Sequence, residues 1–346
     1  MSESTPQAPQ PRRWLRFGIW TAVGVGLTLA LFRFGGVECS ELLATLARLS
    51  PATFLLALGL HLCIYLARAE RFRLLIPAEH RPPRTSLLAV TSAHNLAVYV
   101  LPAKTGEATL PLYLGRTCGV PAAQSIATLV VSRIFDLAAL CACMGTVTLA
   151  LCIGEHWEGP RALGFVLAIG LLGAAGLFLA LAARGDVLIA LIQKLVRGIG
   201  LAGTALGARI EHHAESLKLA LRAAGDGRLR TAALSLSFVV WLLIFAFYGV
   251  LAQGFGLPDG VGFLHASFGS SVAVLMNLLP INSFAGFGTQ EAGWVLGFRW
   301  VGVPAEISLP GGVGVHLVQL FDTVLFGVAG HMLMGLAKRA DGPRAG

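Results

Sequence analysis

Charged residues are scarce in this chain of 346 residues. Only 13% of the residues are Asp, Glu, Lys or Arg, whereas 55% are hydrophobic. In soluble globular domains, roughly a quarter of all residues are charged. The composition therefore excludes an ordinary soluble protein and indicates an integral membrane protein.

Motifs for metals, nucleotides and other cofactors are also lacking. The six cysteines form no Cys-x-x-Cys pair and no metal-ligand spacing, so we interpret them as small apolar packing residues. The 42 glycines fit close packing of helices in lipid better than a phosphate-binding loop. We therefore expect no metal and no cofactor.

Long apolar stretches dominate what is present. A helix needs about 20 apolar residues to cross a bilayer, and six stretches approach or exceed this length, at 14–34, 52–67, 121–153, 161–183, 231–254 and 310–337. Two further stretches, 85–120 and 262–303, are interrupted by Pro102 and Pro280 and by glycines. The expected fold is an all-α polytopic membrane protein with six full spans plus two broken or re-entrant helical hairpins. Pairs of complete thin spans are the alternative for these two stretches, because they preserve the same sidedness.

The positions of the basic residues predict the orientation. Nineteen of the 26 Lys and Arg residues fall in loops and termini on one side of the spans, and four fall on the other. Basic residues favour the cytoplasmic side, so both termini are expected in the cytoplasm and the protein in the inner membrane. This distribution also explains the net charge of +8 without a nucleic-acid partner.

The same pattern divides the chain. We expect a cytoplasmic arm at 1–13, a first membrane half at 14–183, a cytoplasmic amphipathic segment at 184–230, a second membrane half at 231–338 and a cytoplasmic tail at 339–346. In the middle segment, leucines and isoleucines recur at roughly helical spacing between charges, which predicts a helix on the membrane surface or a linker packed on the bundle.

The two interrupted stretches resemble each other. Asn95 to Glu107 and Asn277 to Glu291 each begin with Asn, contain Leu-Pro and end in Glu. A related tetrad follows each of them, RIFD ending at Asp136 and QLFD ending at Asp322. The first stretch starts on the cytoplasmic side and the second on the external side, so we expect an inverted repeat, an architecture that places the site of many transporters at the repeat interface.

Polar residues at bilayer depth are the candidates for function, because a charged side chain at a helix centre costs about 2.5–3.5 kcal/mol on insertion scales. Helix ends freed by the breaks, together with cationic side chains, suit an anionic headgroup such as phosphate. The predicted substrate-binding residues are Asn95, Lys104, Glu107, Arg133, Asp136, Asn277, Glu291 and Asp322.

All of these residues except Lys104 also have a structural interpretation, which is the favoured one for Asp322. Glu107 and Glu291 can cap the broken helices, Arg133 and Asp136 can form a structural pair, and the asparagines can satisfy broken backbone. Glu291 and Asp322 have no obvious cation nearby in the sequence, so a second hypothesis is that Glu291 exchanges a proton. Arg68, Glu70 and Arg71 are expected to anchor the second span at the interface, and contact with lipid headgroups is the alternative.

At these residues the sequence resembles the lysylphosphatidylglycerol synthase transmembrane family, also called the flippase-like domain. The resemblance rests on Asn95, Leu101-Pro102, Lys104, Gly106-Glu107, Arg133, Asp136, Leu279-Pro280, Gly286, Gly288 and Glu291. The sequence departs from the family pattern at Ala285, Phe287 and Gln319, the last of which stands where an arginine is often expected.

The resemblance implies movement of a lipid or an anionic lipid-linked substrate between leaflets, without enzymatic activity. Relatives are linked to phospholipids, hopanoids and polyprenyl-phosphate-linked sugars. No aminoacyl-transfer domain follows the last span, so synthesis of lysyl lipids is not expected. Two alternatives stay open: an intramembrane transferase acting on a lipid phosphate, and an accessory partner of a lipid-glycan pathway.

Overall fold

The computed structural model of the chain describes residue 44 and residues 47–340, apart from 155, 184, 201–202, 205–206, 209, 211–226, 259 and 279–283. This part of the chain is helical and contains no strand, as predicted for an all-α protein. Five of its helices are long and apolar enough to cross a membrane. They are α3 (Pro51–Leu75), α6 (Ala122–Ile153), α7 (Arg161–Ala183), α10 (Gly227–Gly254) and α13 (Ala305–Ala340).

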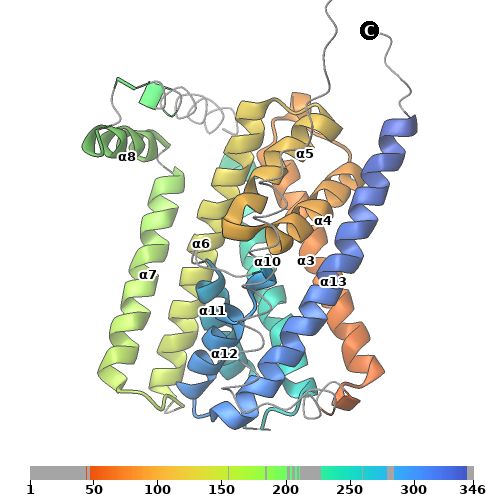
Figure 1. The fold of residues 1–346 in the computed structure, drawn as a ribbon. Helices are drawn as coiled ribbons and strands as arrows, with labels where there is room; N and C mark the ends of the chain where they lie inside the picture. The colour runs from red at the N-terminus through yellow and green to blue at the C-terminus, as the bar shows by residue number, and fades with distance from the viewer. Residues whose placement is uncertain are drawn as a thin grey trace, which may run out of the picture.

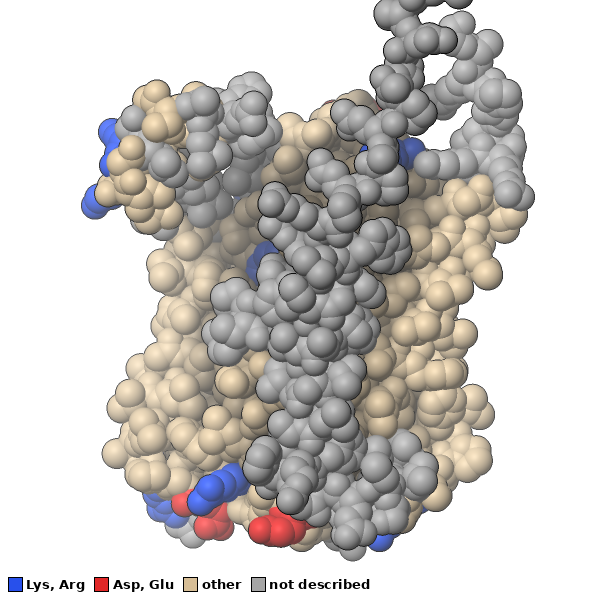
Figure 2. Space-filling model, in the orientation of Figure 1, with Lys and Arg blue, Asp and Glu red and all other residues tan. Residues whose placement is uncertain are grey.

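These five helices correspond to five of the six predicted full spans, and the chain is a multi-pass membrane protein. The predicted first span, 14–34, and the arm before it lie outside the described residues. On the face drawn in Figure 2, nearly all visible charged side chains lie close to the two ends of the molecule, with uncharged surface between them. Such an uncharged band suits contact with the hydrocarbon core of a bilayer.

Both interrupted stretches form short helices that turn back on themselves (Figure 1). The first hairpin comprises α4 (Arg84–Val100), the 3₁₀ segment η2 (Pro102–Ala108) and α5 (Thr109–Cys118). The second hairpin comprises α11 (Phe263–Leu278), the 3₁₀ segment η3 (Phe284–Gly286) and α12 (Thr289–Arg299). At 1.5 Å per residue, α5 and α12 reach only about 15–17 Å, too short to cross a hydrocarbon core of about 30 Å. The structure therefore has re-entrant hairpins and not pairs of complete spans.

Local sequence explains where the first hairpin breaks. Leu101 has the extended conformation, with φ −81° and ψ 132°, and ends α4. A residue before proline is disfavoured in the helical region, so Pro102 sets this end. Gly106 then lies against α4 so closely that a Cβ atom would come within 2.4 Å of the carbonyl oxygen of Ala97. Only glycine fits there.

The second hairpin turns through positive φ angles. Gly286 and Gly288 have φ of 81° and 84°, and between 284 and 340 Ala285 is the non-glycine residue with positive φ, at 54°. The left-handed region costs an L-residue roughly 1–2 kcal/mol. Ala285, one of the three positions at which the sequence departs from the family pattern, therefore has a strained backbone in this turn.

The hairpins enter from opposite ends of the molecule (Figure 1). The helices α4 and α5 occupy the half that carries α8 (Gly185–Gly198), whereas α11 and α12 occupy the other half. The long helix α6 contacts α5 and α11, and α13 contacts α4 and α12. Helices α6 and α13 therefore each pack against both hairpins, which is the arrangement expected of an inverted repeat.

The predicted amphipathic segment 184–230 is described only in part. Within it, α8 lies across the end of α7 (Figure 1), with Val196 buried and Lys194, Leu195 and Arg197 exposed. Residues 211–226 lie outside the described part.

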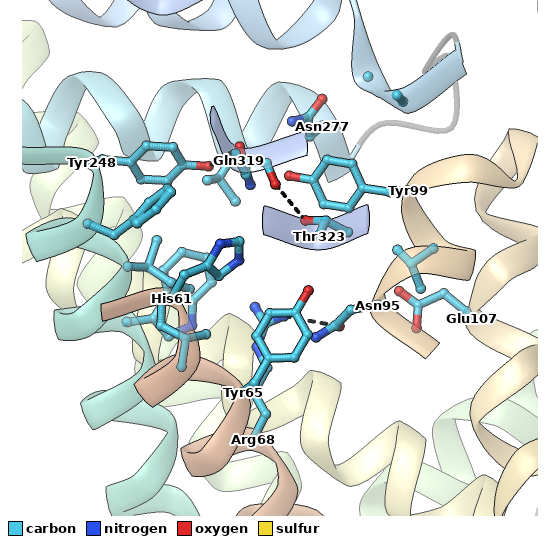
Figure 3. A pocket seen from close by; sticks show the side chains of 18 of the residues that line it. His61, Tyr65, Arg68, Asn95, Tyr99, Glu107, Tyr248, Asn277, Gln319 and Thr323 are labelled. Atoms are coloured by element: carbon cyan, nitrogen blue, oxygen red, sulfur yellow. Dashed lines mark hydrogen bonds between the residues drawn. The ribbon is translucent and has the colours of Figure 1, made fainter. Parts of the chain in front are cut away.

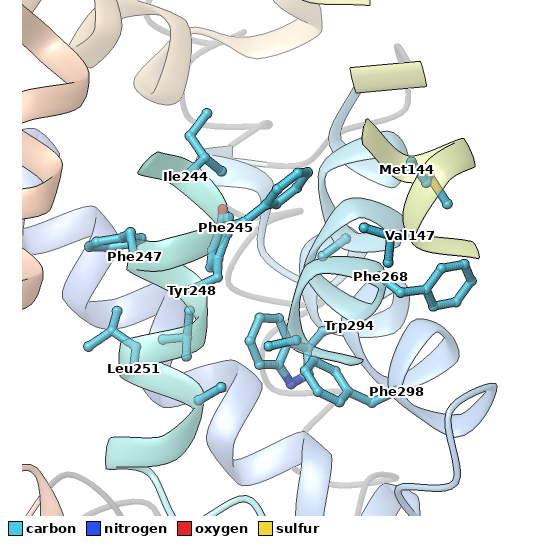
Figure 4. Packing of buried hydrophobic residues seen from close by; sticks show 14 of the residues in the cluster. Met144, Val147, Ile244, Phe245, Phe247, Tyr248, Leu251, Phe268, Trp294 and Phe298 are labelled. Atoms are coloured by element: carbon cyan, nitrogen blue, oxygen red, sulfur yellow. The ribbon is translucent and has the colours of Figure 1, made fainter. Parts of the chain in front are cut away.

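A continuous apolar core supports the second hairpin (Figure 4). Phe268 of α11 and Trp294 and Phe298 of α12 are buried against side chains of α10 and α6, including Phe245 and Met144. Gly269 and Gly297 allow this close packing, because a Cβ atom at Gly297 would lie 2.7 Å from the carbonyl oxygen of Gly269. The hairpin is therefore held by side chains of several helices and not by its own short segments.

The contact between α4 and α13 gives a first prediction. A Cβ atom at Gly327 would lie 2.3 Å from the Leu96 side chain, whereas a Cβ atom at Gly335 on the same helix would meet nothing within 4 Å. Gly327→Val should therefore lower the thermal unfolding midpoint in detergent through overpacking, at a cost of about 1–3 kcal/mol. Gly335→Val is the matched control and should leave the midpoint nearly unchanged; equal midpoints for the two variants would contradict the packing described here.

Candidate functional site

A polar cavity of about 190 Å³ lies where the two hairpins meet. Its walls come from α3, α4, α6, α10, α11, α13 and the breaks in both hairpins (Figure 3). Of the predicted site residues, Asn95, Glu107, Arg133 and Asn277 line the cavity. Segments from both halves of the chain thus build one site, as expected for an inverted repeat.

A chain of ion pairs borders this cavity on the side of the first hairpin. The Arg133 guanidinium donates to Glu107 Oε2 from Nε at 3.1 Å and from Nη2 at 2.7 Å, and to Asp136 Oδ2 at 3.2 Å. Arg71 also donates to both carboxylate oxygens of Asp136. Arg133 is therefore already neutralised by two carboxylates, which makes it a weaker candidate for holding a headgroup than its sequence position indicates.

Arg71 corrects a prediction. It is not an interfacial anchor, because it is fully buried and also donates to Ser237 Oγ of α10 at 2.9 Å. A buried arginine needs paired, hydrogen-bonded partners, and Asp136 is that partner. The signal in the sequence was the spacing of Arg68 and Arg71, since residues three apart lie on the same face of a helix.

Arg68 lies inside the protein, whereas the sequence predicts an interfacial anchor or a contact with lipid headgroups. It lines the cavity, and its Nη1 donates to Asn95 Oδ1 at 3.2 Å (Figure 3). No carboxylate among the described residues pairs with it. Arg68 Nε and Asn95 Nδ2 are buried and have no hydrogen-bond partner in the described part of the chain. The cavity therefore presents a guanidinium and adjacent donors that lack an acceptor.

Glu291 is locked at the start of α12. Its Oε2 accepts from the backbone N–H of Gly288 at 2.7 Å, and its Oε1 lies 2.5 Å from His316 Nδ1 of α13. His316 Nε2 lies 2.9 Å from the carbonyl oxygen of Ala285, so this nitrogen donates. Glu291 is 1% exposed and His316 is fully buried. This geometry matches the capping interpretation, in which the carboxylate joins the broken helix to α13.

Asp322 also has a histidine partner. Its Oδ2 lies 3.0 Å from His61 Nδ1 of α3, and the carboxylate is fully buried. The expectation that Glu291 and Asp322 have no potential cation nearby is therefore wrong. Asp322 meets a histidine 261 residues away, and Glu291 meets one 25 residues away on the next helix, and local pattern carries no signal for either pair.

Amide side chains link the second hairpin to the cavity wall. Asn277 Nδ2 donates to Gln290 Oε1 at 2.6 Å, and Gln290 Nε2 donates to Gln319 Oε1 at 2.9 Å. Tyr248 OH donates to the same oxygen of Gln319 at 3.1 Å. Gln319, at a position where the resemblance leads one to expect an arginine, thus accepts from two donors. The second half of the chain contributes no guanidinium at this position.

The structure brings seven of the eight predicted residues to the cavity or directly behind it. Lys104 is the exception, because its side chain lies outside the described part. Their role in substrate binding stays a prediction. Within the described ranges, no group of three or more His, Cys, Asp or Glu side chains is arranged to hold a metal ion.

Comparison with known proteins gives one match. The family model described as the lysylphosphatidylglycerol synthase TM region matches residues 19–327. No curated protein and no solved structure matches the chain.

The buried ion-pair chain predicts a large effect on stability. Asp136→Asn removes the charge that compensates Arg71, and an uncompensated buried charge costs about 3–5 kcal/mol. The free energy of unfolding in mixed micelles should fall by that order. The double variant Arg71→Met with Asp136→Leu should recover most of the loss, because Arg133 keeps Glu107.

Glu70→Gln is the control for this prediction. Glu70 pairs with Arg84 at the exposed end of α3, where the Arg84 side chain is 71% exposed. Exposed ion pairs contribute little, so this variant should be close to wild type. If the double variant were as unstable as Asp136→Asn, the loss of stability would not come from the uncompensated charge of Arg71.

Proposed function

The chain belongs to the lysylphosphatidylglycerol synthase TM-region family, and from this premise we propose that it is a transporter that moves lipids with an anionic headgroup between the leaflets of the inner membrane. Arg68 carries the proposal. It is a guanidinium inside the cavity that hydrogen-bonds only to an amide among the described residues, and its Nε lacks an acceptor. Guanidinium groups suit phosphate because they can donate two parallel hydrogen bonds.

The charge of the surrounding cluster supports an anionic ligand. Three arginines, at 68, 71 and 133, stand against two carboxylates, at 107 and 136, within the described part of the cluster. One positive charge is therefore left over, and a headgroup phosphate would balance it. A cationic headgroup would need a free carboxylate, but Glu107 and Asp136 are each paired with arginine.

The hairpins support movement between leaflets. Each of them reaches the cavity from a different end of the molecule (Figure 1), so a headgroup bound at Arg68 lies between two short helical barriers. Alternating displacement of repeat halves around a fixed central site is the general scheme for inverted-repeat transporters. The basic side, which carries α8, would face the cytoplasm. Among the candidate lipids, phospholipids and polyprenyl phosphates carry the group that Arg68 suits.

An intramembrane transferase is the second candidate. The observation that favours it is His61, which lines the cavity while Asp322 holds its Nδ1. An imidazole oriented by a carboxylate is a suitable general base. The two candidates differ in their product, because transport leaves the lipid chemically unchanged.

Leaflet exchange of a fluorescent phosphatidylglycerol in proteoliposomes tests the proposal. Wild-type protein should exchange the lipid, and Arg68→Gln should slow exchange roughly ten- to hundredfold, since a hydrogen bond to a charged group contributes about 1.5–3 kcal/mol. The rate follows from dithionite quenching of the outer leaflet. Mass spectrometry of the recovered lipid would show whether it was modified.

Arg116→Gln is the matched control, because Arg116 is an exposed arginine on α5 that does not line the cavity. It should exchange lipid like the wild type. Equal rates for Arg68→Gln and wild type would overturn the assignment of Arg68, and a modified lipid would favour the transferase. Absence of exchange in folded wild-type protein would leave the accessory role.

A further inference from the structure

His61 combines access to the cavity with a buried acidic partner. Its ring is packed by Tyr65, Phe247 and Phe326, with centroid separations of 5.1, 4.8 and 5.8 Å. Asp322 engages Nδ1, so Nε2 is the imidazole nitrogen left to face the cavity (Figure 3). Three rings and one carboxylate thus fix this imidazole at the wall where Arg68 also lies.

The Asp322 carboxylate requires a positive charge or a proton. It is fully buried, its Oδ1 has no hydrogen-bond partner in the described part of the chain, and its Oδ2 meets only His61. An unpaired buried carboxylate is strongly unfavourable. Both favourable arrangements, carboxylate with imidazolium and carboxylic acid with imidazole, hold one proton more than carboxylate with neutral imidazole. The pair is therefore a place for one proton that the two side chains share.

The second acid-histidine pair lacks this access. In the Glu291–His316 pair, His316 Nε2 donates to the Ala285 carbonyl and Glu291 Oε2 accepts from Gly288 N–H. Both nitrogens of His316 are thus occupied and the ring is fully buried. Proton exchange, which the sequence associated with Glu291, fits His61 better.

We propose that the His61–Asp322 pair is the proton-binding site of this transporter and that a proton there and an anionic headgroup at Arg68 favour each other's binding. This inference rests on the proposed function. Arg68 lies seven residues, or two helical turns, from His61 on α3 and repels the proton. A phosphate on Arg68 cancels that repulsion, so each ligand strengthens the other, as linkage requires.

The remaining groups around His61 do not compete for this role. Besides His61 and Arg68, the titratable side chains that line the cavity in the described part of the chain are Tyr65 of α3, Tyr99 of α4, Tyr248 of α10, and the paired Glu107 and Arg133. The tyrosines are neutral near pH 7, and Glu107 is neutralised by Arg133. The variable charge of the cavity is therefore that of His61 and Asp322. One proton bound with one singly charged headgroup leaves the loaded site unchanged in net charge.

The test is proton uptake by the purified full chain in weakly buffered detergent at pH 7 when dihexanoylphosphatidylglycerol binds. Wild type should take up a fraction of a proton, at most one, for each lipid bound, and its affinity should rise by up to tenfold for each pH unit of acidification. His61→Gln and Asp322→Asn should bind lipid without proton uptake and with a flat pH profile. Zwitterionic dihexanoylphosphatidylcholine should cause no uptake.

His331→Gln is the matched control. His331 lies on α13 with Nδ1 against the Gly327 carbonyl oxygen at 2.9 Å, outside the cavity lining, and this variant should keep the wild-type uptake and pH profile. Lipid binding without proton uptake in wild type would overturn this inference and leave the proposed function standing, even if the His61 variant failed to fold. Uptake that persists in His61→Gln would also overturn it, and absence of lipid binding in wild type would overturn both.

Discussion

The pairing of charges in a low-dielectric interior is the constraint on which the rest of this structure depends. Arg71 is fully buried, and so is Asp322, so neither can rely on water. Asp136 links Arg71 to Arg133, which in turn holds Glu107 at the break of the first hairpin. In this row of four side chains, each charge is compensated by the next. Electrostatics as well as packing therefore position helices α3 and α6 and the first hairpin relative to one another.

The broken helices are the second consequence of a medium without water. A break exposes backbone groups that need partners. At the second hairpin Glu291 accepts from Gly288 N–H, and His316 donates to the Ala285 carbonyl. At the first, Thr109 Oγ1 donates to the Gly106 carbonyl at 2.7 Å. The polar residues at the breaks thus stabilise the hairpins, and the breaks themselves reach the cavity wall at Glu107, Ala285 and Gly286.

The two halves of the chain differ in chemistry despite their similar arrangement. In the first half, acids meet arginines, which keep their charge at any physiological pH. In the second half, Glu291 and Asp322 meet histidines, whose rings can bind or release a proton. Gln319 adds to this contrast, since it supplies an amide between Tyr248 and Gln290 and no fixed charge. In the proposed function, a headgroup site of constant charge and a proton site of variable charge share one cavity.

The sequence by itself determined five of the six predicted membrane spans, the break at Pro102 and the opposed entry of the two hairpins. These features depend on local hydrophobicity, on the conformational limits of proline and on the distribution of basic residues, all of which are readable along the chain. Only the tertiary structure decided which charges are paired. His61 and Asp322 are separated by 261 residues and Arg71 and Asp136 by 65, and no local pattern encodes contacts at such distances. For that reason the sequence predicts Arg68 as an interfacial anchor or a headgroup contact, whereas packing of α3 against α4 places it in the cavity beside Asn95.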